Sequence, residues 1–167
     1  MIERSIFSEE HEAFRDSYRR FAEREIAPFH EAWEEQGFVD REVWRKAGEN
    51  GFLCMTMPEE YGGAAADRLY SVVQMEENAR GGYSGVGFSL HTNIVTPYIE
   101  RYGTPQQKLK YLPRMARGEI IGAIAMSEPA AGSDLQGIKA SAIRQADGSY
   151  LLNGSKTFIT NGCTPTW

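Results

Sequence analysis

The chain has 167 residues, of which 41% are apolar and 25% are charged, and its formal net charge is −5. This composition is typical of a globular protein with a sizeable core. The acidic balance and the lack of a basic stripe with interleaved aromatic residues argue against nucleic-acid binding, and no apolar run of about 18 residues predicts a membrane span.

The first residues, MIERSIFSEEHEAF, are rich in acids and contain no apolar segment of the kind that secretory signals carry. The two cysteines, Cys54 and Cys163, are far apart in the sequence and form no C-x-x-C pair. We therefore predict reduced thiols, a cytoplasmic location and no metal site.

Residues 1–118 have the apolar periodicity of helices. Ser8 is a predicted N-cap, and Pro28 is expected to interrupt the helix that follows before it ends at Gly37. The apolar face of this helix recurs at helical spacing, through Phe14, Tyr18, Phe21, Ala22 and Ile26.

Four more helices are expected within this part of the chain. Asp40 and Asp67 are predicted to cap the second and third. The fourth extends over Phe88–Tyr102 with a kink at Pro97, and Thr104 caps the fifth, which ends at 117–118.

After residue 118 the pattern changes to that of strands. The runs 119–126, 138–145 and 155–162 are predicted strands, and Asp-Gly at 147–148 and Asn-Gly at 153–154 predict turns. The predicted fold is α+β, with an N-terminal helical bundle (1–118) followed by the first part of an antiparallel β domain (119–167). A sheet this small is marginal by itself.

Two segments, AMSEPAAGSDLQGIKA (125–140) and LNGSKTFITNG (152–162), resemble the acyl-CoA dehydrogenases, most closely the long-chain branch. MPEEYGG (57–63) and YGTPQQKLKYLPRMARGE (102–119) are also similar to this family. The resemblance covers residues 7–162. It implies a FAD enzyme of fatty acid β-oxidation, with an N-terminal α domain, a middle β domain and a C-terminal α domain.

The resemblance also implies the partners and the site. The substrate is a fatty acyl-CoA, the electron acceptor is electron-transfer flavoprotein, and the full-length protein is a homo-oligomer, a homotetramer in the family. The implied flavin-binding residues are Ile124, Ala125, Met126, Ser127, Gly132, Ser133, Phe158, Ile159 and Thr160. The implied substrate-binding residues are Ser133, Gly87, Phe88 and His91.

The chemistry of this arrangement is plausible on physical grounds. A flavin ring needs an apolar floor and directed polar contacts at its reactive edge. A strand end followed by an irregular loop presents backbone N–H groups and hydroxyls in one place. The resemblance implies that the Ser127 hydroxyl lies near flavin N5. It also places Phe158 at an aromatic position that is often tryptophan in the family, so this chain lacks the indole N–H donor there.

The family's catalytic glutamate comes from the C-terminal domain, which is expected to lie beyond residue 167. No catalytic residue is therefore assigned, Glu128 is given a structural role in its loop, and the chain alone is expected to be an inactive fragment. The individual residues also have ordinary interpretations: Ser133 as a turn cap, Phe158 as a core aromatic, Thr160 as a strand former, and the small residues before His91 as close packing.

Two other functions remain open. One is a flavoprotein of the same fold, such as a nitroalkane oxidase or a flavin monooxygenase. The other is a non-catalytic helical module that binds a partner or an acyl chain.

Overall fold

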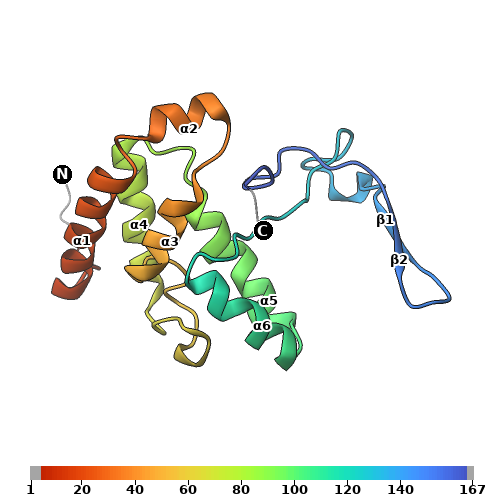
Figure 1. The fold of residues 1–167 in the computed structure, drawn as a ribbon, viewed down its shortest axis with the longest axis horizontal. Helices are drawn as coiled ribbons and strands as arrows, with labels where there is room; N and C mark the ends of the chain where they lie inside the picture. Colours follow the sequence, from red (N-terminus) through yellow and green to blue (C-terminus); the bar gives the residue numbers. More distant parts are fainter. Residues whose placement is uncertain (1–4, 165–167) are drawn as a thin grey trace.

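The computed structural model describes residues 5–164, and Figure 1 shows a helical body from which a β-hairpin projects. The α-helices are α1 (Glu9–Glu25), α2 (His30–Gln36), α3 (Arg41–Glu49), α4 (Arg68–Gly81), α5 (Thr96–Tyr102) and α6 (Pro105–Ala116). Shorter helical segments are η1 (Glu59–Tyr61), η2 (Leu90–Val95) and η3 (Leu135–Gly137), and the strands are β1 (Ser141–Arg144) and β2 (Tyr150–Asn153). The predicted α+β class is confirmed.

The start of α1 confirms the predicted cap and links it to a second helix. The Ser8 hydroxyl accepts from the His11 N–H (3.4 Å), and His11 Nδ1 accepts from the Ser8 N–H (3.0 Å), which forms a capping box. His11 Nε2 also lies 3.1 Å from both carboxylate oxygens of Asp67, the N-cap of α4. One imidazole therefore joins the starts of α1 and α4.

The other predicted caps differ in outcome. Asp67 accepts from the Leu69 N–H (2.7 Å), and Thr104 accepts from the Gln107 N–H (3.2 Å), so both act as predicted. Asp40 occupies the N-cap position of α3, but its side chain makes no capping hydrogen bond. Its carboxylate instead accepts from the Gln36 side chain (3.3 Å). The predicted position of Asp40 is therefore right, but the predicted capping hydrogen bond is wrong.

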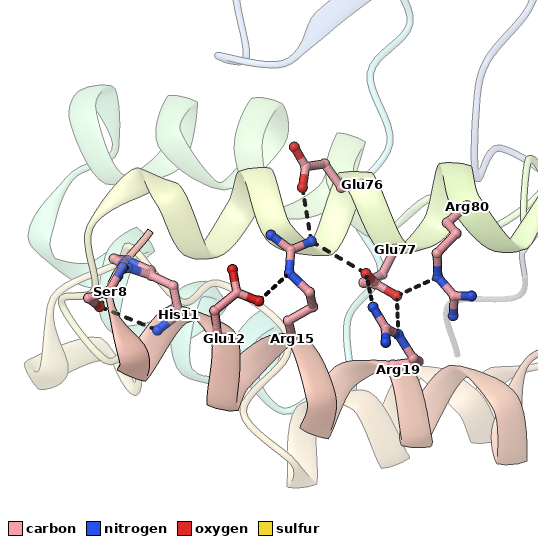
Figure 2. A network of polar contacts seen from close by, with 8 residues as sticks. All are labelled: Ser8, His11, Glu12, Arg15, Arg19, Glu76, Glu77 and Arg80. Atoms are coloured by element: carbon pink, nitrogen blue, oxygen red, sulfur yellow. Dashed lines mark hydrogen bonds and ion pairs between the residues drawn. The ribbon is translucent and has the colours of Figure 1, made fainter. Parts of the chain in front are cut away.

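The polar faces of α1 and α4 are joined by charged groups (Figure 2). Glu77, whose side chain is only 3% exposed, accepts from Arg19 at 2.9 Å, from Arg80 at 2.9 Å and from Arg15 at 3.3 Å. The hydrogen bonds from Arg19, then Arg80 and Arg15, lower the pKa of Glu77 to about 2. This carboxylate is therefore ionised and fully paired, as burial of a charge requires.

The core lies within the helical body. Its fully buried side chains include Trp44, Tyr18, Phe88, Ile26, Met57, Leu112 and Met115. Gly48 lies inside α3 because the Arg117 backbone passes next to it. A Cβ at position 48 would lie 2.6 Å from the carbonyl oxygen of Arg117. The glycine weakens the helix locally but lets α3 and the end of α6 approach closely.

Where a kink was expected at Pro97, the structure has a widened helical turn just before this residue. Residues Leu90–Val95 form a π-helix, and the Thr96 N–H donates to the carbonyl of His91, five residues earlier. The Thr96 hydroxyl donates to the same oxygen (2.8 Å). Pro97 has no N–H to donate. In the wider turn before it, the Thr96 N–H is paired with a carbonyl five residues earlier instead of four.

The β region contains fewer strands than predicted. β1 lies within the expected run 138–145 and pairs antiparallel with β2 across the predicted Asp147-Gly148 turn, with Ser141 opposite Asn153 and Arg144 opposite Tyr150. The runs 119–126 and 155–162 are not strands, so these two predictions are wrong. Their apolar patterns suit a strand, but among the described residues they have no strand beside them, and a strand exists only as part of a pair.

Within the described part of the chain, every helix is too short or too polar to cross a bilayer.

Candidate functional site

The loop after residue 126 is built around Glu128. Its backbone N–H donates to the carbonyl of Ala131 (2.9 Å), and the Ala131 N–H donates back (3.1 Å), which closes a tight turn through Pro129. The buried Glu128 carboxylate accepts from the backbone N–H groups of Lys139 (2.8 Å) and Ala140 (2.9 Å). The carboxylate therefore ties the start of the loop to its end.

A cation completes this arrangement. Lys156 Nζ lies 2.9 Å from Glu128 Oε1 and also donates to the carbonyl of Met126 (2.9 Å). The backbone bond from Lys139, then Lys156, and then the backbone bond from Ala140 lower the pKa of Glu128 to about 2. Glu128 is therefore an ionised anchor of the loop, and its contacts support the structural role expected for it.

The two motifs lie side by side. Besides the contact of Lys156 with Met126, the Thr157 N–H donates to the carbonyl of Ser127 (3.0 Å). The segments 125–128 and 156–158 are thus held together by one backbone hydrogen bond and by the Lys156 side chain, although about 30 residues separate them in the sequence. This brings the predicted residues Met126 and Ser127 close to the start of the predicted Phe158–Thr160 group.

The side chains at this junction are unusually exposed. Phe158 is 95% exposed and has a φ of +55°, and Met126 is 47% exposed. Ile124, Ser127 and Ile159 are half-buried, and Ala125 and Thr160 are exposed. An exposed aromatic in a left-handed conformation is costly without a compensating contact.

Gly132 and Ser133 lie further along the loop, and both are exposed. The next residue, Asp134, caps the short η3 segment through the Gln136 N–H (3.1 Å). The turn-capping role that Ser133 could have had therefore belongs to its neighbour Asp134.

Phe88 and His91 lie in the helical core. The Phe88 ring is fully buried and meets Trp44 edge to face, with ring centroids 4.7 Å apart. His91 is also fully buried, its Nδ1 accepts from the Gly122 N–H (2.9 Å) and its Nε2 lies 3.1 Å from the carbonyl of Met115. These partners place the proton on Nε2, and burial lowers the pKa of His91 to about 4.

The sulfur of Cys54 lies 3.6 Å from His91 Nε2, and burial raises the pKa of this thiol to about 11. Both Cys54, which is buried, and Cys163, which is exposed, are free. Cys54 is therefore held protonated and has little nucleophilic character. Among the described residues, no group of three or more His, Cys, Asp or Glu side chains is arranged to hold a metal ion.

Two residues at this site were missed by the sequence analysis. Lys156 joins the motifs, and Asn161 donates to the carbonyls of Gly122 (3.0 Å) and Gly87 (3.4 Å). The Asn-Gly pair at 161–162 carried a signal, since asparagine is enriched at positive φ, and Asn161 has a φ of +66°. Its partners are 39 and 74 residues away, which local patterns cannot reveal.

Comparison with known proteins identifies the family of this chain. A family model for the acyl-CoA dehydrogenase N-terminal domain matches residues 8–119, and one for the acyl-CoA dehydrogenase middle domain matches residues 123–167. The chain belongs to the acyl-CoA dehydrogenase family. This confirms the resemblance inferred from the two motifs.

Individual relatives show how much of the protein is represented. The chain is 51% identical over 159 residues to the long-chain specific acyl-CoA dehydrogenase, mitochondrial, of Rattus norvegicus. The aligned region covers 95% of this chain and 37% of the rat protein. The chain thus spans about 37% of the length of this curated relative.

Solved structures agree in fold. The acyl-CoA dehydrogenase from Geobacillus kaustophilus superimposes with a TM-score of 0.90 at 50% identity, over 96% of this chain and 42% of that one. An acyl-CoA dehydrogenase from Bacillus anthracis, solved in complex with FAD, superimposes with a TM-score of 0.86 at 36% identity, over 96% of this chain and 28% of that one.

Proposed function

We propose that this chain forms the N-terminal part of a FAD-dependent acyl-CoA dehydrogenase that oxidises fatty acyl-CoA between its α and β carbons. The observation that carries the proposal is the junction of the two motifs, where Lys156 and Thr157 bind the backbone of Met126 and Ser127. The motifs that resemble flavin-binding segments are thereby placed at one exposed location.

The residues at this junction fit a flavin. Phe158 and Met126 offer exposed apolar surface, Ser127 and Thr160 offer hydroxyls, and the Thr157 hydroxyl is buried with no partner among the described residues. A planar apolar ring with polar edges suits such a surface. A flavin bound there would supply the acceptor for a hydride. The residues proposed to hold it are Ile124, Ala125, Met126, Ser127, Gly132, Ser133, Phe158, Ile159 and Thr160.

The substrate assignment is also a proposal. Ser133 is proposed to contact the acyl-CoA, and Gly87, Phe88 and His91 to form the wall beside its acyl chain. Phe88 and His91 are fully buried, so in this arrangement they support the wall from within the helical body, and His91 is uncharged. The similarity to long-chain enzymes favours a long-chain thioester as substrate.

The remaining functional assignments concern the whole protein. We propose the division into residues 1–118 and 119–167, a catalytic base outside this chain, electron-transfer flavoprotein as electron acceptor and a homotetramer at full length. The chain alone is then inactive. The cytoplasmic location stays a prediction, and the name of the rat relative carries the word mitochondrial.

A chimera tests this function directly. This chain replaces the matching part of the rat long-chain enzyme, and bound flavin and dye reduction are measured with butyryl-, octanoyl- and palmitoyl-CoA. We expect a yellow protein that is reduced fastest by the longer thioesters, and no dye reduction by the chain alone. The Ser127→Ala chimera should bind FAD but reduce it more slowly, because the hydroxyl contact strengthens as charge develops.

A folded chimera without flavin, or one that is reduced by none of the three thioesters, would overturn the proposal. Turnover by the chain alone would contradict the assignment of the base to another part of the protein.

A further inference from the structure

The carbonyl and the N–H of Gly122 are held by two different parts of the chain. Its N–H donates to His91 Nδ1 (2.9 Å), and its carbonyl accepts from the Asn161 side-chain amide (3.0 Å). The same amide reaches the carbonyl of Gly87 (3.4 Å). Asn161, which follows the 158–160 segment, therefore joins that segment to the start of the 122–127 segment and to Gly87, which directly precedes the helical residues 88–95.

Gly87 and Asn161 fit each other closely. A Cβ at position 87 would collide with Asn161 Oδ1 and lie 2.8 Å from its Cγ and 2.9 Å from its Nδ2. Asn161 also has a φ of +66°, which most side chains tolerate poorly and asparagine adopts readily. The Asn161 amide thus occupies the space that a side chain at position 87 would fill.

Other contacts in this region act differently. Lys156 and Thr157 join the two motifs to each other through Met126, Ser127 and Glu128. Asn161, in contrast, joins these motifs to the helical body. Without it, the Phe158–Thr160 segment loses this hold on the helical body, whereas the 122–127 segment keeps the hydrogen bond from the Gly122 N–H to His91.

We propose that Asn161 is a positioning residue that latches the Phe158–Thr160 segment onto the helical body, and that Gly87 is small in order to admit its amide. The structural part of this inference stands on the contacts above. Its consequence, a fixed distance between the flavin residues and the acyl-pocket wall, rests on the proposed function.

The structural part is tested by hydrogen exchange of the loop amides, using Asn161→Gly, Gly87→Ala and the double variant. Asn161→Gly keeps the positive φ and removes the amide. The amides of Gly162 and Thr164, which are bonded to Ile159 and Asn161, report on whether the loop is docked. Gly85→Ala is the matched control, because a Cβ there would meet only His30 Nε2, at an ordinary 3.5 Å.

Gly87→Ala should speed the exchange of these two amides roughly fivefold, the effect of losing one hydrogen bond of ordinary strength, and Asn161→Gly, which removes two hydrogen bonds, should speed it at least as much. The double variant should show no further increase, and any drop in melting temperature caused by Gly87→Ala should recover in it, since the collision is gone. Gly85→Ala should leave exchange unchanged.

Unchanged exchange in Gly87→Ala, additive effects of the two substitutions, or unprotected amides in the unchanged protein would each overturn the latch.

The functional part is tested in the chimera with the rat enzyme. Asn161→Gly should shift the absorption maxima of the bound flavin and weaken its binding, whereas Gly85→Ala should change neither. A chimera that never binds FAD refutes the proposed function but not the latch, which the exchange experiment judges separately. A flavin spectrum and affinity unaffected by Asn161→Gly would refute the positioning role.

Discussion

At the scale of single residues, the balance between burial and pairing decides which groups titrate. His91 is buried and stays neutral because its two nitrogens already have partners, the Gly122 N–H and the Met115 carbonyl. Glu128 is buried at its carboxylate and stays ionised because two backbone N–H groups and Lys156 surround it. The hydrogen-bond partners of each side chain, and not its burial alone, therefore decide its charge state.

His91 should make the helical body sensitive to mild acid. Its pKa falls from an ordinary value of 6.5 to about 4 in the folded protein. The unfolded chain therefore binds a proton first, and stability that is full above pH 6.5 declines as the pH falls toward 4, by about 3 kcal/mol. Urea unfolding at several pH values in this window measures the decline.

In His91→Gln the decline across this window should be smaller by that amount, although the variant is less stable at neutral pH. An identical pH dependence in the two proteins would show that folding leaves the pKa of His91 unchanged.

At the scale of elements, the α1–α4 pair depends on Glu77 (Figure 2). Glu77→Gln keeps the shape but leaves three arginines without their shared buried anion, so we expect a loss of about 3 kcal/mol at neutral pH. The folded pKa of about 2 lies below the ordinary 4.5, so this contribution is present above pH 4.5 and disappears as the pH falls toward 2.

Denaturant unfolding at pH 7 and pH 3 measures this effect. Glu12→Gln is the control, because Glu12 is 54% exposed and pairs only at the surface with Arg15, and its loss should cost less than about 1 kcal/mol. Equal losses in the two variants would contradict the role assigned to Glu77.

The elements also show what sequence can predict. The caps at Ser8, Asp67 and Thr104 were predictable because donor and acceptor lie within a few residues of each other. The strands expected at 119–126 and 155–162 were not formed, because a strand depends on a neighbour that local patterns do not describe. The motifs could be found because each is a continuous stretch of sequence. The contact of Asn161 with Gly87 could not, because it joins residues 74 positions apart.

At the scale of the whole molecule, the helical body and the hairpin differ in burial. Tyr18, Trp44 and Leu112 are completely buried in the body, whereas every residue of β1 and β2 is exposed. Local stability follows the apolar area that each part buries. The hairpin should therefore open far more readily than the body.

Hydrogen exchange followed by mass spectrometry should show this difference. Peptides spanning 141–153 are expected to exchange at least about 100-fold faster than peptides from the buried faces of α1 and α4. Equal protection of the two regions would mean that another surface covers the hairpin in solution.

The exposed hairpin also determines what a denaturation curve can report. The dependence of the unfolding free energy on denaturant concentration scales with the surface newly exposed to solvent. β1 and β2, which project from the helical body (Figure 1), are exposed at every residue, so their loss adds almost nothing to that slope. An unfolding midpoint measured for this protein therefore reports the stability of its helices. A substitution such as Leu152→Ala will leave that midpoint unchanged even where it abolishes the pairing of β1 with β2.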